Sequence, residues 1–218
     1  MKIRDRAILN DLKRFRCMSR DDIIDLHFQG IKNGVTCCNT VMKRLRRDGY
    51  VDVNVSQQPY IYFPQPNTIR KTSQKLSHFL GIVDIYKQLA YYEKPKIFEV
   101  EPKYGKDFME PDAFAIWHRA PFFIEFQNSV YSNKVMEKKI GRYEVYFHSD
   151  EWKKQSWQPK NTKIFPSILL VTNKKYHISS ENFRIFQIDS IINFYNQMQL
   201  NEPKRNIKIQ VGSKVISK

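Results

Sequence analysis

Two apolar segments near the middle of the chain carry acidic and amide side chains at positions that could bind a metal ion. Asp112 follows Pro111 at the start of the first segment, and Glu125 and Gln127 lie two residues apart in the second. Residues i and i+2 of a strand point to the same face of a sheet. If residues 118–121 turn a hairpin, Asp112 lies opposite Gln127 on that face. Because hard oxygen ligands suit Mg²⁺, we predict a site for Mg²⁺ or Mn²⁺ on Asp112 and Glu125.

This pattern resembles the PD-(D/E)xK nuclease superfamily, whose core sheet carries Pro-Asp on one strand and Glu-x-Lys on the next. The resemblance implies a metal that activates water and neutralises charge on the scissile phosphate. Without a nearby cation the two carboxylates would repel each other, so we expect the pKa of each to be raised. Gln127 stands where the superfamily has its lysine, and an amide donates a hydrogen bond but carries no charge.

A lysine for this site could come from the next predicted helix. Lys134, Lys138 and Arg142 recur at i, i+4 and i+8, and Lys139 lies one turn before Tyr143. We expect Lys139 or Lys138 to replace the missing lysine. The candidate catalytic residues are therefore Asp112, Glu125, Gln127 and Lys139.

The first 66 residues predict three helices followed by a two-stranded hairpin. Ile8, Leu12 and Phe15 recur at i, i+4 and i+7, the spacing of one helix face. A capping-box pattern begins the second helix, and a glycine ends the third. The predicted elements are a helix through residues 8–15, helices at 20–30 and 36–48, and strands at 51–55 and 60–63. This order is typical of a winged helix-turn-helix, so we expect a winged-helix DNA-binding domain over residues 1–66.

The third predicted helix has a polar and basic face opposite its apolar stripe. In helix-turn-helix proteins the N-terminal residues of this helix contact base edges in the major groove, and basic residues contact phosphates. We expect Asn39 and Thr40 to read bases. The candidate DNA-binding residues are Thr36, Asn39, Thr40, Lys43, Arg44, Arg46 and Arg47. The alternative is an ordinary solvated basic helix face.

Residues 67–218 predict a second, α+β domain with a basic C-terminal tail. The predicted elements are a helix at 76–90, strands at 97–101, 113–117 and 122–127, a helix at 136–147, strands at 168–172 and 183–188, a helix at 190–199 and a possible strand at 207–211. The order αβββαβ is the core topology expected of the nuclease superfamily. Ile124 and Phe126 should pack against a helix on the face opposite Glu125.

Charge is distributed unevenly along the chain. The net charge is +15. Residues 1–50 hold 12 Lys and Arg against 6 Asp and Glu, residues 51–150 hold 13 against 12, and residues 151–218 hold 12 against 4. Basic flanks around an acidic centre suit a protein that binds phosphates at its ends and a metal between them. We therefore expect nucleic acid, as double-stranded DNA, to be the main partner.

The composition excludes a disordered or membrane-spanning chain. Hydrophobic residues make up 41% of the sequence, with only seven glycines, and no apolar run approaches the length of a bilayer span. The three cysteines, Cys17, Cys37 and Cys38, have no metal-type spacing and favour a reducing compartment. The charged N-terminus is not a signal peptide. We expect a cytoplasmic protein.

Several motifs together resemble the replication-relaxation protein family of plasmids and phages of Gram-positive bacteria. The motifs that carry the resemblance are His78 on the helix before the sheet, Pro111-Asp112, Glu125-x-Gln127 and Lys139-x-x-Arg142-Tyr143. The family has Glu-x-Asp at the third motif, so Gln127 replaces a charged metal ligand by a neutral one. The resemblance covers roughly residues 5–175 and implies a role in plasmid replication or relaxation.

Two functions follow from these patterns. The first is a DNA-binding protein of a mobile element, acting in replication or relaxation, with a metal-dependent nickase site. The alternative is a non-enzymatic winged-helix transcriptional regulator whose degenerate nuclease domain serves dimerisation or partner binding. Expected protein partners are a second copy of the chain and replication or relaxation proteins. The amino-acid sequence is compatible with both functions.

Overall fold

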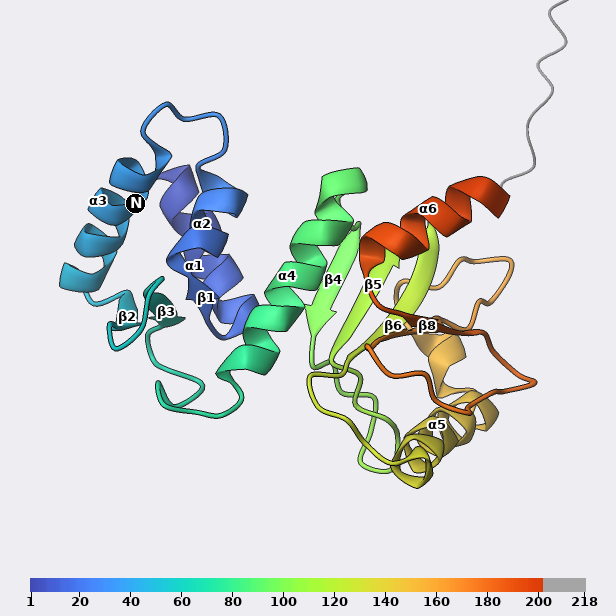
Figure 1. Ribbon diagram of the computed structural model, residues 1–218. Helices are drawn as coiled ribbons and strands as arrows, with labels where there is room; N and C mark the ends of the chain where they lie inside the picture. Colours follow the sequence, from blue (N-terminus) through green and yellow to red (C-terminus); the bar gives the residue numbers. More distant parts are fainter. Residues whose placement is uncertain (202–218) are drawn as a thin grey trace, which may run out of the picture.

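The computed structural model describes residues 1–201 of the chain, so the predicted strand at 207–211 lies outside the described residues. Figure 1 shows an N-terminal unit with a three-stranded sheet and a C-terminal unit with a five-stranded sheet, joined by helix α4 (Leu76–Tyr92). The mixed α+β class expected from the sequence is confirmed. Within residues 1–201, no helix is both long enough and apolar enough to cross a bilayer.

The N-terminal unit follows the predicted order of elements. It contains helices α1 (Ile3–Phe15), α2 (Arg20–His27) and α3 (Gly34–Arg47) and an antiparallel hairpin of β2 (Val51–Asn54) and β3 (Ile61–Pro64). A strand that the sequence did not indicate, β1 (Met18–Ser19), pairs with β3 and gives the sheet order β1-β3-β2. Ser19 ends β1 and caps α2, because its hydroxyl accepts a hydrogen bond from the Asp22 backbone N–H at 3.0 Å.

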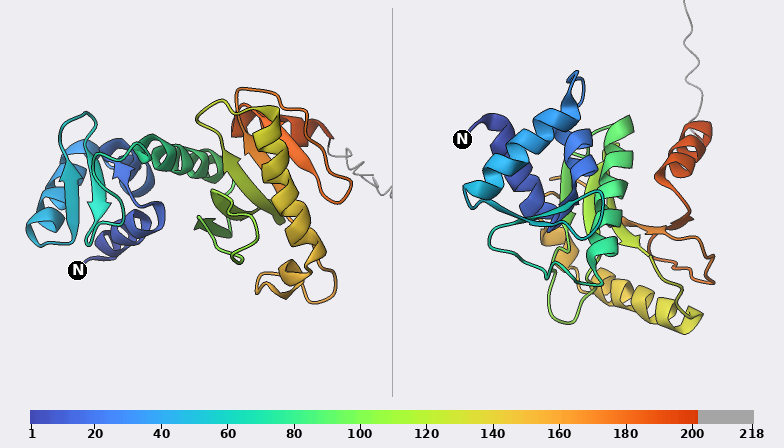
Figure 2. Two further views of the ribbon diagram at one scale, coloured as in Figure 1. Left: turned by 90° about the horizontal axis from the view of Figure 1, so that it is seen from below. Right: turned by 60° about the vertical axis from the view of Figure 1, so that its left-hand side comes forward.

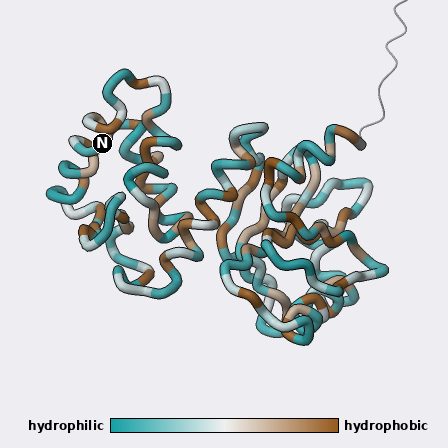
Figure 3. Tube along the Cα trace, in the orientation of Figure 1, coloured by the Kyte–Doolittle hydropathy of each residue, from teal (hydrophilic) through white to brown (hydrophobic). Residues whose placement is uncertain are grey.

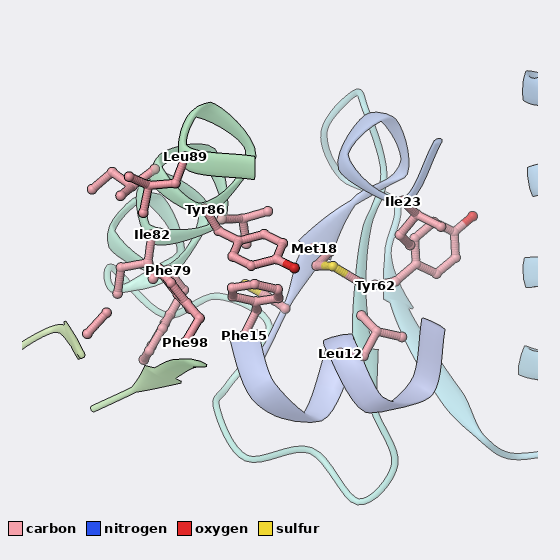
Figure 4. Packing of buried hydrophobic residues seen from close by; sticks show 14 of the residues in the cluster. Leu12, Phe15, Met18, Ile23, Tyr62, Phe79, Ile82, Tyr86, Leu89 and Phe98 are labelled. Carbon is pink, nitrogen blue, oxygen red and sulfur yellow. The ribbon is translucent and has the colours of Figure 1, made fainter. Parts of the chain in front are cut away.

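Helix α4 belongs to the cores of both units, as Figure 4 shows. The ring of Tyr86 packs against Phe15 of α1 and Phe98 of the first strand of the second sheet, with centroid distances of 5.3 and 5.0 Å. Ile8, Leu12 and Phe15 are fully buried, which confirms the predicted apolar face of α1. One hydrophobic cluster therefore crosses the expected boundary after residue 66, and a fragment that ends there would expose Phe15.

The C-terminal unit is built on one mixed sheet in the order β4-β5-β6-β7-β8. Its elements are β4 (Ile97–Val100), β5 (Ala113–Trp117), β6 (Ala120–Phe126), α5 (Asn133–His148), a 3-10 turn (Glu151–Lys154), β7 (Ser167–Val171), β8 (Ile185–Ile188) and α6 (Ile191–Asn201). Strands β4 to β6 are antiparallel, whereas β6, β7 and β8 are parallel. From α4 to β7 the element order is the αβββαβ order that the sequence predicted.

Side chains that alternate along β6 contact helices on opposite faces of the sheet. Phe122 packs against Phe194 of α6, and Phe123 packs against Tyr143 of α5. Figure 2 shows α5 and α6 on different sides of the five-stranded sheet. In Figure 3 the hydrophobic colours gather along the strands of this sheet, while α3 is largely hydrophilic. The sheet is therefore covered on both faces, with α5 on the face to which Glu125 points.

The register of the β5–β6 hairpin differs from the prediction. Trp117 pairs with Ala120, so the turn consists of His118 and Arg119 alone, both with positive φ angles of 46° and 63°. Left-handed conformation at both central residues is the geometry of a tight two-residue hairpin turn. Ala113 pairs with Ile124. One residue farther from the turn, Asp112 therefore lies opposite Glu125. The prediction that Asp112 lies opposite Gln127 was wrong.

The face of β6 opposite Glu125 packs against α4, as predicted for Ile124 and Phe126. Ile124 is buried, and the ring of Phe126 lies directly over Gly81 of α4. A Cβ atom at Gly81 would lie 2.1 Å from Cε1 of Phe126. The absence of a side chain at this position lets α4 approach the strand that carries Glu125.

We predict that Gly81→Ala destabilises the protein by about 1–3 kcal/mol, because the added methyl group forces the Phe126 ring out of its place. Gly141→Ala is the matched control. Gly141 lies in the interior of α5 with no heavy atom within 4 Å of an added Cβ, so this change should stabilise by about 0.5–1 kcal/mol through helix propensity. Urea denaturation of both variants measures the two free energies, and equal signs would contradict the packing.

Candidate active site

Five side chains from four segments of the C-terminal unit meet at one end of β6. His78 lies in the first turns of α4, Asp112 directly precedes β5, Glu125 lies near the end of β6, and Lys139 and Tyr143 lie in α5. Lys139 and Tyr143 are four residues apart and so share one face of the helix. Contacts between these side chains link both carboxylates to the two flanking helices.

Glu125 is the buried centre of the cluster. It is only 2% exposed, on a strand with helices over both faces. Its Oε1 accepts a hydrogen bond from the Tyr143 hydroxyl at 2.6 Å, and its Oε2 contacts Nζ of Lys139. A buried carboxylate needs such partners, because an unpaired charge away from water is costly. Tyr143 is therefore a core residue that also holds the carboxylate in place.

Asp112 is held by the opposite helix and by the backbone of β6. Its Oδ2 accepts a hydrogen bond from the Phe126 N–H at 2.7 Å, and its Oδ1 lies 3.3 Å from Nε2 of His78. These contacts fix the carboxylate next to Glu125 at the mouth of the hairpin. The role of His78, which the sequence left open, is to orient Asp112.

The pKa values of the two carboxylates are shifted in opposite directions. Burial raises the pKa of Glu125 to about 7, against the lowering effect of Lys139 and with a further rise from the charge of Asp112. Burial also raises the pKa of Asp112, but the His78 hydrogen bond, the charges of Lys139 and His78 and the Phe126 N–H together outweigh it, so this pKa is lowered. The expectation of two raised pKa values assumed no nearby cation, and Lys139 and His78 lie beside these carboxylates; the pKa of Glu125 is raised mainly by burial, and that of Asp112 is lowered.

The structure distinguishes between the candidate lysines of α5. Lys139 is partly buried, with 33% of its side chain exposed, and contacts Glu125. Burial lowers the pKa of Lys139, but the charges of Glu125 and Asp112 raise it by more than burial lowers it, so the amine stays protonated. Lys138, Lys134 and Arg142 are exposed on other faces of the helix. Lys139 is therefore the lysine that α5 brings to the carboxylates.

Gln127 lies beside the carboxylates with one end of its amide unsatisfied. Its backbone N–H donates to the Val171 carbonyl at 2.9 Å, which continues the pairing of β6 with β7. Its Nε2 is buried and has no hydrogen-bond partner among the residues that the structure describes. The amide lines an open pocket of about 600 Å³ together with Asp112, Glu125 and Lys139. An acceptor on a ligand in this pocket could satisfy the amide.

The donor set suits a weakly held Mg²⁺ or Mn²⁺ ion. Two carboxylates and an amide face the same pocket, and Mg²⁺ is commonly bound by one or two carboxylates together with waters and substrate phosphates. Residues 1–201 contain no cluster of three or more His, Cys, Asp or Glu side chains arranged to hold a metal. The carboxylates and the amide are of the types that can bind Mg²⁺ or Mn²⁺ when waters and a phosphate complete the coordination.

Glu101 and Glu110 also line the pocket, and the sequence did not place Glu101 there. Glu101 directly follows β4, and its backbone N–H donates to the Asp112 carbonyl at 2.9 Å. Its Oε2 accepts a hydrogen bond from Nε of Arg16, which follows α1, at 3.2 Å, and Nη2 of Arg16 lies 3.1 Å from the same oxygen. No sequence pattern indicates this pair, because its members are 85 residues apart. The contact ties the N-terminal unit to the rim of the site.

The match to known protein families covers this site. Residues 62–160 match the replication-relaxation family. This segment of the chain is similar to the replication-relaxation domain. The matched segment contains every side chain of the cluster, whereas α1 to β2 lie outside it. No curated protein and no solved structure gives a significant match. A role connected with replication is thus indicated for the domain.

Ahead of the matched segment, α3 presents most of the predicted DNA-binding residues to solvent. The exposed members are Thr36, Asn39, Thr40, Lys43, Arg46 and Arg47. Arg44 lies on a different side of the helix, where its Nη2 contacts the buried carboxylate of Asp5 at 2.9 Å. Asp5 is 1% exposed, so Arg44 stabilises the packing of α3 on α1 and is a poor choice for testing DNA contact.

A groove of about 390 Å³ lies between α3 and the β2–β3 hairpin. Three basic side chains, Arg20, Lys43 and Arg46, line it together with Asn39 and Tyr60. Arg20 and Tyr60 come from elements outside α3, and sequence reasoning about the α3 face alone did not include them. The groove extends the basic surface of α3 toward the hairpin.

The titration of Glu125 predicts a difference in pH dependence between the wild type and Glu125→Gln in metal-free buffer. A carboxyl group whose folded-state pKa is raised contributes stability that is present below its unfolded pKa of 4.5 and lost as the pH rises through about 7. Gln cannot titrate. From pH 5 to pH 8 the stability of Glu125→Gln relative to the wild type should therefore rise, by on the order of 1–3 kcal/mol.

Urea denaturation at the two pH values with EDTA present measures this difference. The pKa of His78 is raised by its hydrogen bond to Asp112, so His78 also contributes stability that is lost as the pH rises. Because His78 is present in both proteins, its contribution largely cancels. Parallel pH profiles would show that Glu125 is ionised throughout and would contradict the raised pKa of this buried carboxyl group.

Proposed function

We propose that the protein binds duplex DNA of a plasmid or phage through an N-terminal winged helix and nicks that DNA with a PD-(D/E)xK-like site in its replication-relaxation domain. The observation that carries the proposal is the contact of Lys139 with Glu125 beside Asp112. This contact supplies, from α5, the cation that Gln127 cannot provide on β6. Nicking would relax supercoiled DNA and open a strand for replication.

The winged-helix part of the proposal rests on topology and exposure. Three helices, a short strand after α1 and an antiparallel hairpin after α3 give the order of a winged helix. The third helix exposes polar residues near its N-terminus and basic residues toward its C-terminus. Polar side chains suit contacts with base edges, and basic side chains suit contacts with phosphates.

Each residue of the site has a role that follows from its contacts. Asp112 and Glu125 would hold a divalent ion, which when bound supplies a water of lowered pKa and neutralises charge on the phosphate. Lys139 would stabilise the negative charge that develops on the phosphate, and the free Nε2 of Gln127 would donate to a phosphate oxygen. His78 and Tyr143 orient the two carboxylates.

A non-enzymatic DNA-binding protein is the second candidate, and one observation favours it. Each of the four carboxylate oxygens of Asp112 and Glu125 already contacts a protein donor or cation. Such a site is electrostatically satisfied without a metal, and the domain could then serve only to bind DNA or a partner. Activity measurements distinguish the two candidates.

We predict that the wild-type protein converts supercoiled plasmid carrying its own replication region to nicked circles in Mg²⁺ or Mn²⁺. Lys139→Ala should slow this reaction by about 10²-fold, the usual effect of removing one group that stabilises the transition state. Lys138→Ala is the matched control, because Lys138 is the adjacent lysine but is exposed and away from Glu125. It should nick at the wild-type rate.

Agarose gels of a time course measure the nicked fraction, and near-ultraviolet circular dichroism checks that each variant is folded. Equal loss of activity in both lysine variants would contradict the role of Lys139. The absence of nicking by the wild type at millimolar metal would leave the non-enzymatic candidate.

We predict that Lys43→Ala, Arg46→Ala and Arg47→Ala combined weaken duplex binding by the full chain across sequences. The slope of log K against log salt should fall by about one for each phosphate that the variant no longer neutralises. Arg44 stays unchanged, because it pairs with Asp5. Lys13→Ala is the control, since Lys13 is exposed on α1 and forms no ion pair within residues 1–201. Fluorescence anisotropy at several salt concentrations measures both slopes, and an unchanged slope in the triple variant would exclude α3 as the DNA-binding helix.

A further inference from the structure

The loop between β6 and α5 places an exposed aromatic side chain at the mouth of the candidate active site. Tyr131 lines the same pocket as Asp112, Glu125 and Lys139, and 45% of it is exposed. Val130 beside it is 73% exposed. The strand that leads into this loop is otherwise buried. An exposed aromatic ring beside charged side chains can contact a ligand that is both aromatic and charged.

The backbone of Tyr131 is fixed although its ring is exposed. Its N–H donates to the hydroxyl of the buried Tyr176 at 3.1 Å, and its carbonyl accepts from Nζ of Lys174 at 3.2 Å. The next residue, Ser132, caps α5, because its hydroxyl accepts from the Val135 N–H. The ring therefore extends from a fixed point on the rim, and little conformational entropy is lost when it contacts a ligand.

Basic groups lie on the α5 side of Tyr131, although the pocket that it lines also contains carboxylates. Lys134 is exposed in the first turn of α5 and forms no ion pair with any acidic residue in the part of the chain that the structure describes. The N-terminus of α5, with its free backbone N–H groups, adds partial positive charge at the same place. The rim thus combines an exposed aromatic ring with positions for phosphates on a path that leads to Lys139.

We propose that Tyr131 stacks on an unpaired base of the DNA strand whose phosphate lies in the pocket, so that the site takes a single-stranded or locally opened strand. A base within a duplex has both its faces covered by neighbouring bases, so a side chain can stack on it only after the strand opens. This inference extends the proposed function by naming the form of DNA that the site takes. It concerns binding and not cleavage.

The test measures binding of the full chain to a short single-stranded DNA in EDTA, where no cleavage occurs. The oligonucleotide carries 2-aminopurine, whose fluorescence is quenched when an aromatic ring stacks on it. Tyr131→Ala should weaken binding by about 5- to 100-fold, the range that base–aromatic stacking gives, and should abolish the quenching. Tyr131→Phe keeps the ring and should retain both. Tyr91→Ala is the control, because Tyr91 is 84% exposed on α4 but does not line this pocket.

Duplex affinity should stay unchanged in Tyr131→Ala, since α3 and not this rim binds duplex. Wild-type affinity for single strands in Tyr131→Ala would overturn the inference. Equal losses in Tyr131→Phe and Tyr131→Ala would also overturn it, because they would show that the hydroxyl and not the ring makes the contact. Stacking without nicking by the wild type would support this inference while refuting the cleavage proposal, so the two can fail separately.

Discussion

A carboxylate buried on the middle strand of the sheet constrains how the helices of the C-terminal unit pack. Glu125 is 2% exposed, and its burial is tolerable only because α5 brings Lys139 and Tyr143 to its two oxygens. That requirement fixes the position of α5 over the sheet. On the other face, Phe126 lies over Gly81, which lets α4 approach closely enough for His78 to reach Asp112. The same contacts therefore determine both the geometry of the site and the packing of the two helices.

Helix α4 connects this site to the N-terminal unit. One of its faces packs against α1 through Tyr86 and Phe15, and Lys87 forms ion pairs with Asp22 at 2.6 Å and Asp25 at 3.0 Å in α2. The pair of Arg16 with Glu101 adds a contact from the end of α1 to the pocket rim. If α3 binds DNA as proposed, these contacts hold the site at a defined position relative to α3, which is useful if the nick must fall at a fixed distance from the bound sequence.

Much of the fold could be predicted from periodicity, because apolar spacing reports burial directly. The face of α1, the order of elements and the opposite faces of Glu125 and Phe126 all follow from repeats of about 3.6 and 2 residues. The hairpin register could not, because it depends on whether two or four residues form the turn at positions 118–121. The choice of Lys139 over Lys138 depends on how α5 is oriented about its own axis, which helix spacing alone does not determine. Arg44 was grouped with DNA-binding residues because helix spacing alone does not reveal the buried Asp5 39 residues earlier in the chain.

The central claim is that a lysine on α5 has taken over the role of the motif lysine missing from β6. Gln127 lines the same pocket as Lys139, so the lysine can be moved back to the strand. The decisive measurement is the nicking rate of the double variant Lys139→Ala with Gln127→Lys, compared with Lys139→Ala alone in Mg²⁺ or Mn²⁺. We predict that the double variant nicks at least about tenfold faster than the single variant, since a cation again reaches the phosphate. A folded double variant that nicks no faster than Lys139→Ala would contradict the account.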